Sequence, residues 1–172
     1  MPADLVSILN ELGQKAKELA PRLNFGGCCV YAGLVAVALE ERGYPAQGRV
    51  TSWNAGRGDA ASITEARKKV KSNTVKEWNL QGIYFGHVGI EFYDGKDVYL
   101  YDSKGCKPVD ELLGSECSFE GRLTVQELND LWEYNGPTMD YPVSWNMDFD
   151  RDLIPALQRL INKHFNKVPA AS

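Results

Sequence analysis

Two adjacent cysteines follow a pair of glycines in residues 24–32 (NFGGCCVYA). The apolar run beyond them predicts a helix from Cys28 to Arg42, which places the first thiol in the first helical turn. Unpaired N–H groups and the positive end of the helix dipole favour a thiolate there, and the glycines let a substrate carbonyl approach the sulfur. Cys28 is therefore a candidate nucleophile. The alternative, that Cys28 and Cys29 are small core residues, is equally compatible with this segment.

Two predicted strands further along the chain carry a histidine and an aspartate. Residues 83–93 and 98–102 are rich in β-branched and aromatic side chains, as is typical of strands. Between them stands Asp94-Gly95, a sequence typical of two-residue hairpin turns. The two segments are therefore predicted to pair as an antiparallel hairpin.

The length of the turn decides which side chains of the hairpin face each other. With two turn residues, Tyr93 pairs with Lys96, and the same register pairs His87 with Asp102. Directly paired residues have Cβ atoms roughly 4.5–5.5 Å apart, so the carboxylate could hold the imidazole in one tautomer. A thiol, a histidine and an orienting aspartate are the ingredients of thiol nucleophilic catalysis. Taken alone, His87 is an ordinary strand histidine and Asp102 an ordinary residue before a turn, and a one-residue slip would separate them.

Three segments of the chain, which carry the cysteine, the histidine and the aspartate in that order, form a pattern. GGC at 26–28 is followed by Ala32, four residues after the cysteine, and by GYPA at 43–46; HVGIEF stands at 87–92 and YDS at 101–103. Together these segments resemble the nucleophile, histidine and aspartate regions of transglutaminase-like and papain-like thiol enzymes. The N-x-G-G-C form is similar to that of small phage-encoded relatives of these enzymes. The resemblance covers about half of the chain.

The resemblance implies a fold and a set of catalytic residues. The fold is α+β, with helices packed on a small antiparallel sheet and the cysteine at the N-terminus of one helix. The catalytic residues are Cys28, His87 and Asp102. The offset from Ala32 favours Cys28 over Cys29 as the nucleophile.

The sequence departs from the family pattern in two places. No oxyanion-hole side chain is obvious, and Asn24 is the candidate, with the backbone N–H of Cys28 as the second donor. Asn24 is equally typical of a turn, which would leave it without a catalytic role. Gly89 stands after the histidine, where these enzymes often have a tryptophan.

The expected function is that of a thiol hydrolase or acyl transferase acting on an amide bond of a protein or peptide. Peptidase or amidase activity ranks first. A transglutaminase or deamidase acting on protein glutamine is an alternative, because the same thioester intermediate serves both reactions. A second alternative is a non-catalytic module that binds a host protein through the same fold.

The composition of the chain argues against some classes of partner and predicts its cellular location. The 172 residues carry a net charge of −4 without a lysine- or arginine-rich tract, so nucleic acid is not an expected ligand. The longest mainly apolar stretch, residues 30–39, is too short to cross a bilayer, and no secretory signal is visible. We therefore expect no membrane partner and a cytoplasmic location, in the host cytoplasm if the chain is phage-encoded. Four cysteines without a CxxC pair and two histidines predict no metal and no cofactor.

The remaining patterns describe the elements that must position these residues. We expect a single α+β domain over residues 1–172, beginning with an amphipathic helix. Residues 53–79, rich in glycine, serine, asparagine, lysine and arginine, are expected to form an exposed insertion. Residues 124–167 are expected to be mainly helical, starting with a capping box between Thr124 and Glu127.

Overall fold

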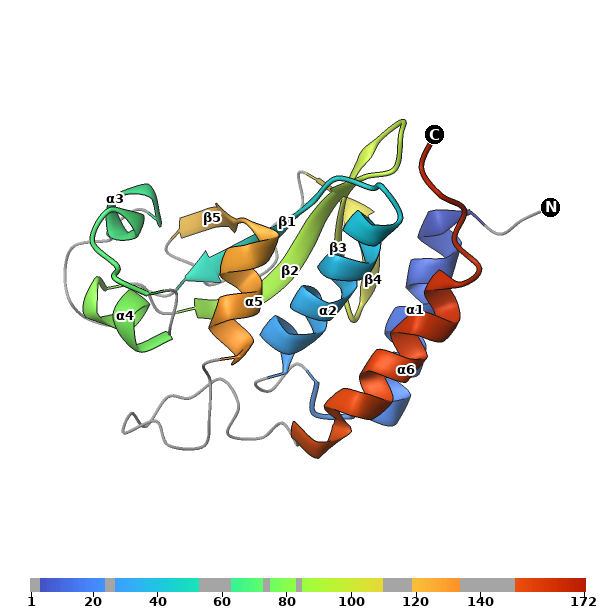
Figure 1. Ribbon diagram of the computed structural model, residues 1–172, viewed down its shortest axis with the longest axis horizontal. Helices are drawn as coiled ribbons and strands as arrows, with labels where there is room; N and C mark the ends of the chain where they lie inside the picture. The colour runs from blue at the N-terminus through green and yellow to red at the C-terminus, as the bar shows by residue number, and fades with distance from the viewer. Residues whose placement is uncertain are drawn as a thin grey trace.

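An antiparallel sheet forms the centre of the fold, and helices pack against it (Figure 1). The computed structural model describes residues 4–23, 27–52, 63–72, 75–82, 85–109, 119–133 and 151–172. Within these ranges five strands follow the order β4-β3-β2-β1-β5, and each neighbouring pair is antiparallel. The strands are β1 (Ala46–Ser52), β2 (Phe85–Tyr93), β3 (Val98–Asp102), β4 (Gly105–Pro108) and β5 (Phe119–Leu123). The expected α+β class, with helices on an antiparallel sheet, is confirmed.

The helices differ in the strands that they contact. Helix α2 packs on β1 and β2 and also contacts α5 and α6, while α1 contacts α6 and β4 (Figure 1). The short helices α3 and α4 lie near the end of the sheet where β1 finishes and β2 begins (Figure 1). The helices are α1 (Leu5–Leu19), α2 (Cys28–Glu41), α3 (Ile63–Arg67), α4 (Val75–Leu80), α5 (Val125–Glu133) and α6 (Ile154–Phe165), with a 3-10 turn at Arg151–Leu153.

Both N-terminal helices begin where their sequence signals indicate. The Asp4 side chain accepts a hydrogen bond of 2.7 Å from the Ser7 N–H and so caps α1. Helix α2 begins at Cys28, ends one residue before Arg42, and is followed by Gly43 with a φ of +84°. Helix α2 is buried on nearly all sides, because its sequence is apolar around the whole circumference. The helix that carries the candidate nucleophile therefore occupies the middle of the core.

The hairpin between β2 and β3 has a longer turn than the sequence predicts. Tyr93 pairs with Val98 rather than with Lys96, so the predicted register is wrong by two residues. The turn contains four residues, and the Asp94 carboxylate accepts hydrogen bonds from the backbone N–H groups of Lys96 and Asp97 at 2.8 and 2.7 Å. These bonds stabilise the wider loop against the two-residue turn. A shift of two residues leaves every side chain on the same face as before, because the strand period is two.

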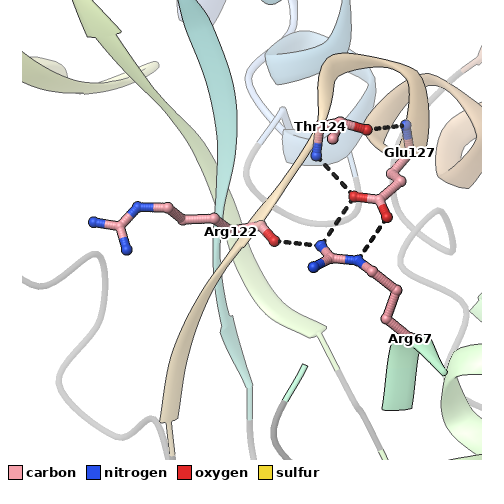
Figure 2. Close-up of polar contacts among 4 residues, drawn as sticks. All are labelled: Arg67, Arg122, Thr124 and Glu127. Carbon is pink, nitrogen blue, oxygen red and sulfur yellow. Dashed lines mark hydrogen bonds and ion pairs between the residues drawn. The ribbon is translucent and has the colours of Figure 1, made fainter. Parts of the chain in front are cut away.

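The segment between β1 and β2 is anchored to the rest of the fold, where the structure describes it. Lys68, Lys69 and Lys71 are exposed, whereas Ala66 and Trp78 are fully buried in the core. Arg67 of α3 forms two hydrogen bonds with the Glu127 carboxylate, at 2.7 and 3.0 Å (Figure 2). Its guanidinium also donates to the Arg122 carbonyl of β5 at 2.7 Å (Figure 2). Helix α3 is thus fastened to both β5 and α5.

The capping box at the start of α5 is confirmed. The Glu127 N–H donates to the Thr124 hydroxyl at 3.1 Å, and the Thr124 N–H donates to the Glu127 carboxylate at 2.8 Å (Figure 2). The final helix α6 starts with Pro155 in its first turn, where a missing N–H costs little.

In the described part of the chain, no helix is both long and apolar enough to cross a membrane.

Candidate functional site

Cys28 is the first residue of α2 and is only 6% exposed. The residue before it, Gly27, has no side chain to cap the helix, and its carbonyl accepts the first helical hydrogen bond, from the Tyr31 N–H at 2.9 Å. The first N–H groups of a helix have no partner within the helix itself. The sulfur of Cys28 therefore lies beside backbone dipoles that favour a negative charge.

His87 and Asp102 form a hydrogen-bonded pair between neighbouring strands. The distance between His87 Nε2 and Asp102 Oδ2 is 3.0 Å, and the side chains are 17% and 4% exposed. The other carboxylate oxygen, Oδ1, accepts a hydrogen bond of 2.8 Å from the Lys104 N–H. That bond depends on the tight turn into β4, in which Asp102 pairs with Gly105 at a φ of +111°.

These contacts keep the Asp102 carboxylate ionised. Burial alone raises its pKa, but hydrogen bonds from His87 and the Lys104 N–H, together with the charges of Lys107 and His87, lower the pKa to about 2. Asp102 is thus an anion throughout the neutral range. A buried anion of this kind both orients the imidazole and favours its protonated form.

His87 connects Asp102 to the candidate nucleophile. Burial alone lowers the pKa of His87, but the hydrogen bond to Asp102, a hydrogen bond to Cys28 and the charges of both partners raise the pKa to about 9. At neutral pH His87 is therefore an imidazolium in contact with the Cys28 sulfur. A cation at this place can stabilise a thiolate. Because Asp102 is bonded to Nε2 of the imidazole, Nδ1 is the ring nitrogen that remains for the Cys28 sulfur.

Cys28 lines a narrow pocket of the described structure. This pocket leaves no room for a water-sized sphere. Two larger cavities, of about 310 and 430 Å³, lie elsewhere and share no lining residue with the site. The pocket is lined by Cys28, Tyr31, Ala32, Val88, Ile90, Tyr101, Asp102 and Ser103.

A chain of hydrogen bonds ties the start of α2 to β3 and α1. Tyr101 of β3 donates its hydroxyl proton to the Leu9 carbonyl of α1 at 2.9 Å. Because that proton is used, the 2.5 Å contact between the two tyrosine hydroxyls has Tyr31 as the donor. Tyr31 lies one helical turn after Cys28, and Tyr101 directly precedes Asp102. The chain therefore holds the nucleophile-bearing helix against the strand that carries the aspartate.

The second cysteine contacts α5. Cys29 is fully buried, and its sulfur lies 3.9 Å from the Leu128 carbonyl of α5. Burial and the neighbouring Cys28 raise the pKa of the Cys29 thiol well above its ordinary value. The structure thus brings Cys28, and not Cys29, together with His87 and Asp102. The oxyanion candidate Asn24 lies outside the described residues.

One polar partner of the site is absent from the sequence prediction. The Lys107 ammonium of β4 lies 3.3 Å from Asp102 Oδ2. The sequence interpretation missed it because β4, a strand of four residues, was not anticipated. Lys104 and Lys107, which follow Asp102 closely in the sequence, could have suggested such a contact. Within the described ranges, no group of three or more histidine, cysteine or acidic side chains is arranged to hold a metal ion.

No protein-family model, no curated protein and no solved structure matches the chain significantly.

Proposed function

We propose that this chain is a thiol hydrolase or acyl transferase of the papain-like or transglutaminase-like type, which acts on an amide bond through a thioester. The observation that carries the proposal is a part-buried His87–Asp102 pair whose imidazole also contacts Cys28 at the N-terminus of a helix. Nucleophile, proton carrier and orienting carboxylate are then linked in one chain of contacts.

The first half of the reaction uses the thiolate and the imidazolium. The Cys28 sulfur attacks the carbonyl carbon of the amide and forms a tetrahedral intermediate with a negatively charged oxygen. The His87 imidazolium then gives its proton to the amide nitrogen, the C–N bond breaks, and the amine leaves. The acyl group remains on Cys28 as a thioester, and His87 is neutral.

The second half transfers the acyl group to an acceptor. The neutral His87 takes a proton from water, and the oxygen attacks the thioester carbon to release the acid and the thiolate. Peptidase or amidase activity, which we rank first, ends in this way. If the acyl donor is a glutamine side chain, ammonia is the leaving amine and the glutamyl group is held on Cys28 as the thioester. Attack by an amine on this thioester gives a transglutaminase, and attack by water gives a deamidase. The backbone N–H of Cys28, with Asn24 as the candidate side chain, would stabilise the oxyanion.

A second candidate function is favoured by the shape of the site. The pocket that Cys28 lines has no room for a water-sized sphere, and the Cys28 residue is only 6% exposed. So little room beside the candidate nucleophile fits a module that retains the fold and binds a host protein without catalysis. The reactivity of the thiol separates the two candidates.

The decisive experiment is alkylation of the folded protein by iodoacetamide near pH 6, with the modified residue mapped by mass spectrometry. We expect Cys28 to react stoichiometrically and faster than free cysteine, and we expect Cys28→Ala to lose this reaction. The matched control is Cys29→Ala, which should retain it. Slow reaction of every thiol in the folded parent protein would reject the enzyme and favour the binding module.

A further inference from the structure

Asp102 lies between two cationic side chains from the strands on either side of β3. Its Oδ2 atom is 3.0 Å from His87 Nε2 and 3.3 Å from Lys107 Nζ. The Lys107 side chain is 20% exposed, compared with 4% for Asp102. A single carboxylate oxygen is therefore shared between the imidazole and a lysine ammonium.

The position of Lys107 follows from the pairing of β3 with β4. Asp102 pairs with Gly105, and Leu100 pairs with Lys107, so Lys107 is diagonal to Asp102 on the same side of the ladder. Diagonal neighbours are within reach of long side chains. The tight turn between the two strands thus places the ammonium beside the carboxylate.

We propose that Lys107 is a positioning residue for the thiol chemistry, which holds the Asp102 carboxylate in place and limits how strongly that carboxylate favours protonation of His87. This inference rests on the proposed function and adds a fourth residue to its site. Because both nitrogens contact the same oxygen, the lysine charge lies close to the imidazole and opposes a second positive charge there. Lys107 therefore keeps His87 able to release its proton to a leaving amine.

The other titratable groups facing the pair do not supply a comparable charge. Cys28, from α2, contacts His87 and favours the imidazolium. The pKa values of Tyr31, Tyr101 and Cys106 are all raised, chiefly by burial, so these three groups are neutral near pH 7. Among the described residues, Lys107 is thus the positively charged side chain, besides His87, that contacts the Asp102 carboxylate.

The test is the titration of His87, followed by NMR of its ring protons in the full-length protein. The His87 signal is identified by its absence from His87→Asn, since His164 is the only other histidine. In Lys107→Met we expect the titration midpoint to rise by about 0.5–1 pH unit, a three- to tenfold change in acid dissociation constant. Lys107→Arg, which retains the charge, should restore the parent midpoint.

Two further variants keep the test decisive. Lys96→Met removes the same charge from a lysine whose side chain is 86% exposed, in the loop that precedes β3, and should leave the midpoint unchanged. Lys107→Gln keeps a donor for Asp102 without the charge, so it should shift the midpoint like Lys107→Met and serves if that variant does not fold. A midpoint equal to that of the parent in the charge-free Lys107 variants would overturn the inference.

The same titration separates this inference from the proposed function. If Cys28 is unreactive but the midpoint rises in Lys107→Met, the proposed enzyme fails while the coupling between Lys107 and His87 stands. If Cys28 reacts through His87 but the midpoint does not move, the enzyme stands and the role of Lys107 is rejected.

Discussion

His87 and Asp102 form a 3.0 Å hydrogen bond although they are not directly opposite each other in the sheet. The β2–β3 ladder pairs Ile90 with Tyr101, so Asp102 is displaced by two residues from the position facing His87. The two side chains meet along the diagonal of the ladder. Diagonal neighbours lie farther apart than directly paired residues, and the imidazole is large enough to span this distance. This diagonal contact is the basis of the first two predictions.

Replacement of His87 tests the proton carrier. We expect His87→Ala to slow alkylation of Cys28 near pH 6 on the order of 100-fold, because no cation remains beside the sulfur. Asp102→Ala should slow it less, since an orienting group acts through geometry and charge. The control is His164→Ala: His164 is buried, its Nδ1 donates to the Leu160 carbonyl of α6 at 2.9 Å, and its Nε2 lies 3.6 Å from the Glu11 carboxylate of α1. Rate–pH curves for the folded variants that all overlay the parent curve would refute the assigned roles.

The same pair predicts a fall in stability at alkaline pH. The pKa of His87 is raised from its ordinary value of 6.5 to about 9, so its stabilising contribution is complete below pH 6.5 and disappears as the pH rises through 9. We expect a loss of about 1–3 kcal/mol in the free energy of unfolding over this window. Urea unfolding of Asp102→Asn provides the comparison, because its alkaline loss should be clearly smaller. Equal losses in both proteins would show that another group is responsible.

The acid side of the pH profile has the opposite sign. The pKa of Asp102 is lowered from 3.8 to about 2, so its contribution is complete above pH 3.8 and is lost as the pH falls through 2. Between pH 4 and 6.5 both contributions are present. We therefore expect the stabilising effect of the pair, measured as parent minus Asp102→Asn, to be flat in this interval.

Much of the helical structure could be predicted from local signals. The Asp4 cap, the Thr124–Glu127 capping box and Gly43 after α2 are short-range features whose chemistry is complete within a few residues. Burial of α2 follows from a sequence that is apolar on all sides. These elements form because their neighbours in sequence already favour them.

The sheet was harder to predict, because its pairing depends on contacts between distant segments. Asp94-Gly95 indicated a hairpin, but the side chain of Asp94 stabilises a four-residue loop that the dipeptide alone does not specify. The short strands β4 and β5 carry little alternation and depend on β3 and β1 for their partners. Lys107 was missed for this reason. His87 and Asp102 were still placed together, since an error of two residues preserves the face of a strand.

The tyrosine chain predicts an asymmetry between two conservative substitutions. Tyr31→Phe removes a donor, but Tyr101 keeps the Leu9 carbonyl as its acceptor. Tyr101→Phe instead removes the acceptor of the buried Tyr31 hydroxyl, and burying an unpaired polar group costs roughly 1–3 kcal/mol. We expect Tyr101→Phe to lower the free energy of unfolding more than Tyr31→Phe, whose cost should be about 1 kcal/mol. A larger loss for Tyr31→Phe would mean that the hydroxyls have the opposite donor order.

Gly13 provides a prediction about how α1 supports the site. An added Cβ at this position would lie 3.0 Å from the Ser103 carbonyl oxygen and 3.3 Å from the Tyr101 hydroxyl. Alanine is the better helix former by about 1 kcal/mol, but overpacking against a rigid backbone costs about 1–3 kcal/mol. We therefore expect Gly13→Ala to lower the free energy of unfolding and to shift the turn that positions Asp102.

The matched control for Gly13→Ala is Gln14→Ala, at the next residue of the same helix, whose side chain is exposed. Glutamine and alanine differ by only a few tenths of a kcal/mol in helix propensity, and the substitution adds no new contact, so its effect on unfolding should lie within about 0.5 kcal/mol of zero. Because Ser103 directly follows Asp102, displacement of its carbonyl should also slow alkylation of Cys28 in Gly13→Ala and not in Gln14→Ala. An increase in stability for Gly13→Ala, with unchanged alkylation, would show that α1 and the turn after Asp102 are not in close contact.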